Sequence, residues 1–132
     1  IGEPTFHFKS TSAEYYCNLG NVNLAKRDFI QAEKAFLTAL TATPQHHESL
    51  WTNLAIVSLN MRDFGTALTR IKTALSKNPD HPNAILTAGM IYEHQGDQEN
   101  AKRQFNEFLA VANAKDTERI QYARTRLGEA NS

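Results

Sequence analysis

The chain has 132 residues, which is enough for one ordinary domain with a buried core. Its 14 basic and 14 acidic side chains balance, so the composition gives no general attraction to nucleic acid or to an anionic membrane, both of which favour clustered Lys and Arg. No apolar run approaches the roughly 20 residues that span a bilayer, and the single cysteine, Cys17, excludes an internal disulfide.

Residues 1–11 are predicted to be an N-terminal arm or linker. Phe6 and Phe8 alternate with polar neighbours over a stretch too short for a stable element of its own. The segment has none of the features of a secretory signal peptide. Because the chain starts at Ile1 rather than at Met, we expect a processed chain or a fragment of a longer protein, from the cytoplasm or the periplasm.

A unit of about 34 residues then occurs three times. Arg27-Asp28-Phe29 recurs as Arg62-Asp63-Phe64. Apolar and small residues recur with the same offset and once more further on: Ala32, Phe36, Ala39, Leu40 and Pro44, then Ala67, Ile71, Ala74, Leu75 and Pro79, then Ala101, Phe105, Phe108, Leu109 and Asn113. Five aligned positions in three copies are difficult to produce by chance, so we place the copies at 13–46, 48–81 and 82–115.

Each copy predicts two helices joined by a short polar turn, because its apolar residues are spaced three and four apart. Thr11 and Glu14 have the spacing of a capping box that opens the first helix, and Pro82 suits the first turn of the fifth. An aspartate that can accept from free backbone amides begins each second helix: Asp28, Asp63 and Asp97. A small residue that predicts a close helix crossing recurs in each first helix: Gly20, Ala55 and Gly89.

These residues resemble the tetratricopeptide repeat family, in its bacterial type. The matches are Tyr16, Leu19, Gly20, Ala32, Phe36, Ala39 and Pro44 in the first copy, Trp51, Leu54, Ala67, Ala74 and Pro79 in the second, and Gly89, Tyr92, Ala101 and Phe105 in the third. The chain departs from the pattern at Asn23 and Ser58, where a Tyr is usual. The resemblance implies an all-α fold over residues 12–132, a right-handed superhelical solenoid of three antiparallel helix-turn-helix hairpins with a C-terminal capping helix.

The capping helix is predicted over residues 116–127. Asp116 stands at its start and Gly128 follows its end, while Ile120, Ala123 and Leu127 share one face. A terminal repeat needs such a cover because its apolar outer face would otherwise be exposed to water.

No catalytic or cofactor-binding motif is present. The chain has no glycine-rich phosphate loop, no G-x-S-x-G elbow and no H-E-x-x-H helix, and no local motif pairs Cys17 with a His. His46, His47 and His81 fall in inter-repeat turns without a completing set of ligands. We therefore predict that the protein is not an enzyme and has no cofactor and no metal site.

The resemblance implies that the first helix of each hairpin lines a concave groove. Eight residues of that lining are candidates for binding a peptide: Asn18, Asn21, Asn53, Ile56, Asn60, Asn83, Thr87 and Met90. A side-chain amide donates and accepts hydrogen bonds at once, which suits it to hold the main chain of an extended peptide, with Ile56 and Met90 adding apolar contact. The alternative interpretation is that these are ordinary solvated residues.

One specialised partner class is not expected. Heat-shock cochaperone domains of the family clamp a C-terminal carboxylate with two Asn and three basic residues. Asn21 and Asn53 match those asparagines, but Cys17, Asn83 and Thr87 replace the basic residues. A carboxylate buried without such charges is costly to desolvate.

The function predicted from the sequence is protein–protein interaction, as an adaptor, scaffold or assembly factor that binds a peptide or partner protein in the groove. The resemblance to bacterial members suggests pilus or secretion-complex assembly as the process. Two alternatives remain open: a self-associating structural segment of a longer solenoid, and a secretion-type chaperone for an unfolded client. No nucleic-acid partner and no direct membrane insertion are expected, and the sequence does not specify an oligomeric state.

Overall fold

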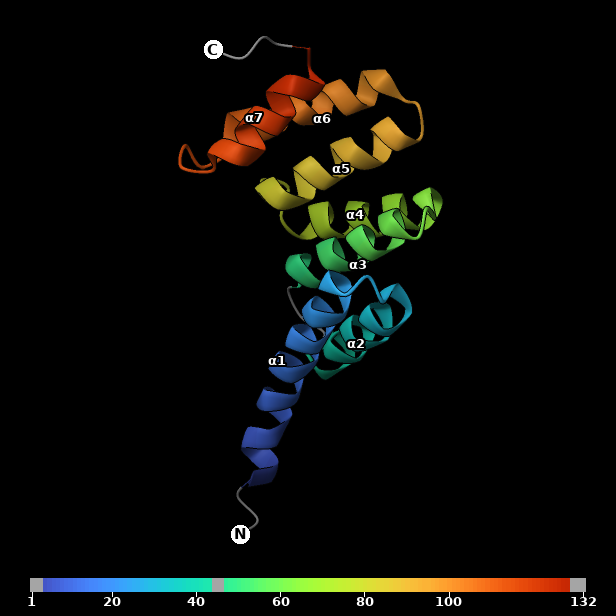
Figure 1. Cartoon of the computed structure of the whole chain (residues 1–132). Coiled ribbons are helices and arrows are strands. Elements are labelled where there is room, and N and C mark those ends of the chain that lie inside the picture. The colour runs from blue at the N-terminus through green and yellow to red at the C-terminus, as the bar shows by residue number, and fades with distance from the viewer. Residues whose placement is uncertain (1–3, 44–46, 129–132) are drawn as a thin grey trace.

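The computed structural model describes the backbone of residues 4–43 and 47–128, and the side chains in these ranges from Ser12 onward. Over these residues the chain forms seven α-helices and no strand: α1 (Pro4–Ala25), α2 (Phe29–Ala42), α3 (Glu48–Asn60), α4 (Phe64–Lys77), α5 (Pro82–His94), α6 (Gln98–Val111) and α7 (Thr117–Arg126). Successive helices pair as hairpins, which stack in chain order with α7 on the last (Figure 1). The predicted all-α repeat architecture is confirmed. None of the described helices is both long and apolar enough to cross a membrane.

The helix boundaries follow from the capping residues. Asp28, Asp63 and Asp97 each precede the second helix of a hairpin, and each carboxylate accepts from the backbone N–H three residues further on, at 3.2 to 3.3 Å. Such a cap is worth about 1 kcal/mol. Pro82 occupies the first turn of α5, where its missing N–H leaves no bond unmade. The helix starts predicted at these four residues are confirmed, whereas Pro44, the last of the aligned positions in the first copy, lies outside the described residues.

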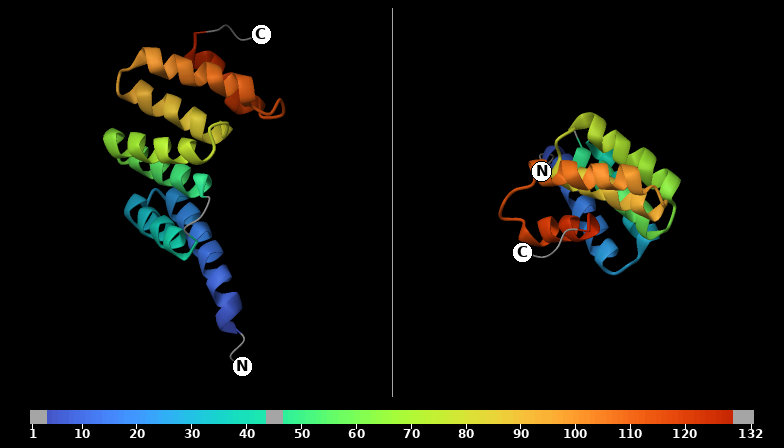
Figure 2. Two further views of the ribbon diagram at one scale, coloured as in Figure 1. Left: turned by 180° about the vertical axis from the view of Figure 1, so that it is seen from behind. Right: turned by 90° about the horizontal axis from the view of Figure 1, so that it is seen from above.

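The structure differs from the sequence-based expectation at the N-terminus. Residues 4–11, expected to be an arm or linker, continue α1 as a helix, and no helix starts at Thr11. This part of α1 projects past α2 (Figures 1 and 2). Nucleating a helix is costly, but extending one adds a hydrogen bond for each residue fixed. A segment too short to form a helix alone can therefore prolong one that the first hairpin holds in place.

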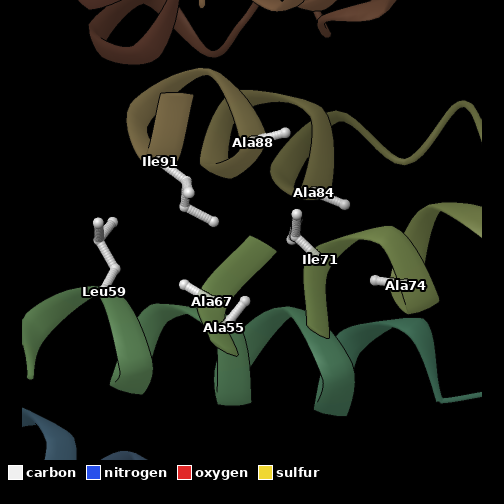
Figure 3. Packing of buried hydrophobic residues seen from close by; sticks show 8 residues of the cluster. All are labelled: Ala55, Leu59, Ala67, Ile71, Ala74, Ala84, Ala88 and Ile91. Carbon is white, nitrogen blue, oxygen red and sulfur yellow. The ribbon is translucent and has the colours of Figure 1, made fainter. Parts of the chain in front are cut away.

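The core consists of buried apolar clusters between neighbouring hairpins. The middle cluster joins α3, α4 and α5 through Ala55, Leu59, Ala67, Ile71, Ala74, Ala84, Ala88 and Ile91 (Figure 3). A second cluster surrounds Phe36 between the first two hairpins. The third contains Phe105 and Phe108, and Ala123 of α7 is fully buried in it. Hence α7 covers apolar surface that the last hairpin would otherwise expose.

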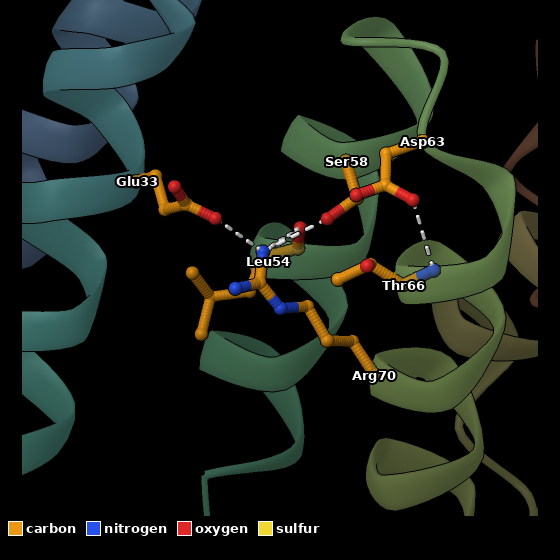
Figure 4. Close-up of polar contacts among 6 residues, drawn as sticks. All are labelled: Glu33, Leu54, Ser58, Asp63, Thr66 and Arg70. Atoms are coloured by element: carbon orange, nitrogen blue, oxygen red, sulfur yellow. Dashed lines mark hydrogen bonds and ion pairs between the residues drawn. The ribbon is translucent and has the colours of Figure 1, made fainter.

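A polar contact also joins the first two hairpins (Figure 4). The Nη1 atom of Arg70, on α4, lies 2.7 Å from a carboxylate oxygen of Glu33 on α2. The same atom donates to the Ser58 hydroxyl at 2.8 Å and to the Leu54 carbonyl at 3.4 Å, both on α3. Because the Arg70 side chain is only 16% exposed, this network is shielded from water more than an ordinary surface ion pair.

Candidate functional site

A cavity of about 670 Å³ lies between α3, α5 and α7. One face of α5 lines it with residues spaced three and four apart: Asn83, Leu86, Thr87, Met90 and His94. The other lining residues are Ile56, Leu59 and Asn60 of α3, Glu118, Arg119 and Tyr122 of α7, and Arg27 and Arg62 from the turns after α1 and α3. Three first helices or their turns and the C-terminal helix therefore converge on one hollow.

The floor of the cavity is apolar. Leu59 and Leu86 are buried, and Ile56 and Met90 are half-buried. Thr87 is buried as well, and its hydroxyl donates to a carbonyl of its own helix, that of Asn83, at 2.7 Å. The floor can thus offer van der Waals contact and apolar burial to a ligand, but little hydrogen bonding.

Two side-chain amides, those of Asn60 and Asn83, also line the cavity. The Nδ2 group of Asn60 donates to the Ile56 carbonyl at 2.8 Å, which leaves the side-chain oxygen available. Within the described part of the chain, the Asn83 side chain makes no hydrogen bond. Both amides can accept a hydrogen bond from the main chain of a bound segment, and Asn83 can also donate one.

Three exposed arginines, Arg27, Arg62 and Arg119, form the rim of the cavity. The first two have an unusual backbone conformation. Arg27 and Arg62 have φ angles of 65° and 63°, in the left-handed region that most residues avoid. Their guanidinium carbons lie 5.1 and 5.2 Å from the ring centroids of Phe29 and Phe64, within the range of cation–π attraction. Each side chain is therefore held near the cavity by an aromatic ring two residues further along.

The wall contributed by α7 is fixed to α5 and α6. Arg126 donates through Nε to a carboxylate oxygen of Glu93 at 2.7 Å, and its Nη2 lies 2.7 Å from the same oxygen. The ring of Tyr122 meets that of Phe105 edge to face, with centroids 6.2 Å apart. Burial, and then the Glu93 carboxylate, raises the pKa of Tyr122, so its hydroxyl remains a hydrogen-bond donor throughout the neutral range.

The structure brings together five of the eight residues predicted to bind a peptide. Ile56, Asn60, Asn83, Thr87 and Met90 all line the cavity. Their role, and that of the whole set, stays a prediction. Thr87 contributes only as part of the floor, because its hydroxyl is already bonded within α5.

The other three, Asn18, Asn21 and Asn53, do not line the cavity. Asn18 and Asn21 are exposed on α1, and Asn53 is half-buried on α3. None of the three side chains hydrogen-bonds to another described residue. These amides are therefore not required by the fold in the described part of the chain.

Sequence reasoning missed the arginines and the contribution of α7 to the lining of the cavity. In the sequence, Arg27 and Arg62 mark the repeat, and one further signal sets them apart: the third copy has Gly96 at the corresponding position. The buried face of α7 was recognised from Ile120, Ala123 and Leu127. Its cavity-lining residues follow no apolar period, so nothing in the sequence pointed to them.

Cys17 is half-buried on α1 and does not have the properties of a nucleophile. Burial, and then the nearby Glu14 carboxylate, raises the pKa of Cys17, so its thiolate is scarce at neutral pH. Among the described residues, no group of three or more His, Cys, Asp or Glu side chains could hold a metal ion. His46 lies outside those residues.

Several solved structures share this fold at low sequence identity. The type III secretion translocator chaperone SycD of Yersinia enterocolitica superposes with a TM-score of 0.83 at 12% identity, covering 89% of this chain and 90% of that one. PcrH, solved with the chaperone binding region of PopB, gives 0.81 at 16% identity, with 89% and 95% covered. The TPR2B domain of yeast Sti1, in a complex with pHsp70, gives 0.78 at 17% identity, with 89% and 97% covered.

Sequence comparison identifies the repeat itself. No curated protein matches the chain significantly. The model of the tetratricopeptide repeat matches residues 13–46 and 82–115, which together make up more than half of the 132 residues. With its three stacked helical hairpins, the chain belongs to the tetratricopeptide repeat family.

Proposed function

We propose that this protein is an interaction module, an adaptor or assembly factor rather than an enzyme, that binds an extended segment of a partner protein in the cavity between α3, α5 and α7. The cavity itself carries the proposal: it places an apolar floor beside amides and guanidinium groups. Its volume is that of a site that takes a few side chains. Family membership supports a protein as the partner.

The physical gain from such binding is the covering of apolar surface. Ile56 and Met90 are half-buried, and Tyr122 is 37% exposed. Removing apolar surface from water is worth about 25 cal/mol per Å², and an extended segment can insert alternate side chains while its main chain meets polar groups at the edge. Asn60 and Asn83 lie where they can receive that main chain.

A longer segment would also meet Asn18, Asn21 and Asn53. These residues belong to α1 and α3, the helices that precede α5 in the row of first helices. Their amides have no bond to other described side chains or backbone. Binding by these three residues remains part of the proposal, in addition to the cavity.

The structural relatives support a protein segment as ligand. PcrH was solved with the chaperone binding region of PopB, and the Sti1 domain in a complex with pHsp70. SycD is described as a type III secretion translocator chaperone. Within the proposed function, the likeness to SycD supports a secretion-type chaperone role, in which the bound segment belongs to a client protein.

A selection experiment tests the proposal. Random dodecapeptides displayed on phage are selected against the immobilised protein, and the affinities of enriched peptides are then measured for the parent and for Ile56→Ala with Met90→Ala. Losing two apolar contacts should weaken binding by about tenfold or more. The control is Leu37→Ala with Val111→Ala, two exposed apolar side chains outside the cavity. An unenriched pool, or equal affinity for the cavity variant and the parent, would overturn the proposal.

A second candidate function, self-association, is favoured by one observation on α1. Tyr15 and Val22 are 56% and 49% exposed, whereas the corresponding residues of the second copy, Leu50 and Val57, are 3% and 0% exposed. In α3 those residues pack into the cluster around Phe36 of the preceding hairpin. Thus α1 presents apolar side chains at the positions through which α3 packs on a neighbouring hairpin.

Light scattering over a range of concentrations tests this second candidate. If α1 mediates self-association, the mass of the parent should rise with concentration, and that of Tyr15→Lys with Val22→Lys should not. A constant monomer mass for the parent would exclude it.

A further inference from the structure

We propose that the cavity between α3, α5 and α7 selects a partner segment in which acidic residues flank an apolar one, with Arg27, Arg62 and Arg119 binding its carboxylates. The inference rests on the proposed function and adds the chemistry of the segment. Its basis is the cationic rim around the apolar floor.

The backbone at Arg27 and Arg62 indicates that these side chains have a use beyond the turn. The turn between the helices of each hairpin needs one residue with positive φ, and in the third hairpin that residue is Gly96, at 81°. Glycine adopts a positive φ without strain, whereas a residue with a Cβ atom is strained in this conformation. In the first two hairpins an arginine adopts it, and both of those arginines line the cavity.

The guanidinium groups of Arg27 and Arg62 are held in place by aromatic rings but have no anionic partner among the described residues. Each lies over an aromatic ring, that of Phe29 or Phe64, and Phe64 is itself stacked on His94 with centroids 5.4 Å apart. Among the described residues neither guanidinium forms an ion pair or a hydrogen bond. Positioned donors lose less freedom when they bind a carboxylate, and guanidinium can do so with two parallel hydrogen bonds.

The rim is positively charged although the chain as a whole is neutral. Its lining includes three arginines and only one carboxylate, that of Glu118. Arg119 lies 3.6 Å from Asp116, an exposed contact that a ligand can compete with. The Glu93 carboxylate is already paired with Arg126 at 2.7 Å. A segment carrying Asp or Glu complements this rim, and one carrying Lys or Arg does not.

The floor favours a protein segment over a nucleic acid. Leu59, Leu86 and Met90 offer an aliphatic surface that suits Leu, Ile, Met or Phe of a peptide. The arrangement also differs from the carboxylate clamp considered above. The clamp would need basic residues at Cys17, Asn83 and Thr87 on the helices, whereas these arginines come from two turns and α7.

Replacing Arg27 and Arg62 by glycine separates binding from folding. The variant Arg27→Gly with Arg62→Gly gives these turns the residue that the third copy already has, so its unfolding midpoint should stay near that of the parent. The matched control, Lys72→Ala with Lys102→Ala, removes the same charge from exposed positions on α4 and α6 outside the cavity.

The dodecapeptide selection described above is run on the parent and on both variants. The parent pool should be enriched in Asp and Glu next to Leu, Ile, Met or Phe. The glycine variant should keep the apolar preference and lose most of the acidic one, because only Arg119 of the three arginines remains, and the lysine control should keep both. For one enriched peptide, replacing its Glu by Gln should weaken binding to the parent by tenfold or more, and added salt should weaken the Glu form more than the Gln form.

The outcomes distinguish the two proposals. An enriched pool without acidic preference overturns the acidic segment and leaves peptide binding intact, whereas no enrichment at all overturns both. An acidic preference that survives undiminished in the glycine variant, or that falls equally in the lysine control, overturns the assignment to Arg27 and Arg62. A single-stranded oligonucleotide that displaces the acidic peptide at equal concentration overturns the choice of a protein segment.

Discussion

A Cβ atom on Gly20 would lie 2.4 Å from the Cε1 atom of Phe36, closer than real atoms approach. The same relationship recurs in the third hairpin, where a Cβ on Gly89 would lie 2.7 Å from Cε1 of Phe105. The aromatic ring of the second helix thus occupies the space above a glycine of the first. In these two hairpins, a large residue at one position requires the smallest residue at the other.

The first prediction follows from this contact. Gly20→Ala should destabilise the protein by about 1–3 kcal/mol, because the Phe36 ring is fully buried and has little room to move. Urea unfolding measures the difference. The control is Gly65→Ala in α4, where a Cβ would meet no atom within 4 Å. That change should stabilise by about 0.5–1 kcal/mol, since alanine is the better helix former.

The second hairpin indicates a further substitution that should rescue Gly20→Ala. It has Ala55 and Ile71 where the first hairpin has Gly20 and Phe36, and both residues are fully buried in the middle cluster. Gly20→Ala combined with Phe36→Ile should therefore be more stable than the sum of the two single changes predicts. Strict additivity in the double-mutant cycle would contradict a direct exchange of volume between the two positions.

A second prediction concerns α7. Ending the chain after Lys115 removes the fully buried Ala123 and the partly buried Ile120 and Leu127 from the last cluster. The free energy of unfolding should fall by about 2–4 kcal/mol, because buried aliphatic side chains contribute about 1.5–3 kcal/mol each when fully covered. A chain that ends after Gly128 is the control. If both forms have the same urea midpoint, α7 does not contribute to the stability of the array.

A third prediction concerns the contact between the first two hairpins. Arg70→Met keeps the apolar part of the side chain but removes the donor to Glu33 and to the buried Ser58. The expected loss of stability is about 1–3 kcal/mol. Arg103→Met changes an exposed arginine whose side-chain bond is to Asn100 on its own helix, and should change stability by less than about 0.5 kcal/mol. Equal effects of the two changes in urea unfolding would show that the contact is not stabilising.

The fold was predictable because the same residue pattern recurs three times, so the copies can be aligned with one another within this one sequence. Asp28, Asp63 and Asp97 mark the same turn three times, and a local rule for helix starts is enough to place them. The sequence also marked Ser58 as a departure from the family pattern, where a Tyr is usual. It could not show that Arg70 of the next helix reaches Ser58, because that contact depends on how the hairpins stack.

The cavity was only partly predictable for the same reason. Ile56, Asn60 and Met90 lie on the first helices, where the repeat alignment places the groove lining directly. The position of Tyr122 in the cavity could not be predicted from the sequence. Because α7 has no counterpart in the repeat, the alignment does not show which side of α7 faces α5. Residues 4–11 lacked an apolar period of their own, and their helical form follows from continuity with α1 rather than from local pattern.

A fourth prediction concerns Cys17. Burial, and then Glu14, raises its pKa above that of an ordinary cysteine, so alkylation by iodoacetamide at neutral pH should be slower in the folded protein than in urea. Because the pKa is higher in the folded state, this group contributes stability below the pKa of an unfolded cysteine, about 8.5. That stability is lost as pH rises through the folded value. Equal alkylation rates in the two states would contradict the shift.

The last prediction concerns the asparagines outside the cavity. If a bound segment continues along the first helices, Asn18→Ala with Asn53→Ala should weaken binding of the selected dodecapeptides about tenfold, since each lost hydrogen bond costs about 0.5–1.5 kcal/mol. The melting temperature should not change, because neither side chain bonds to another described residue. Asn106→Ala, an exposed asparagine on α6, is the control. Unchanged affinity in the double variant, with a loss in Ile56→Ala and Met90→Ala, would confine the contact to the cavity between α3, α5 and α7.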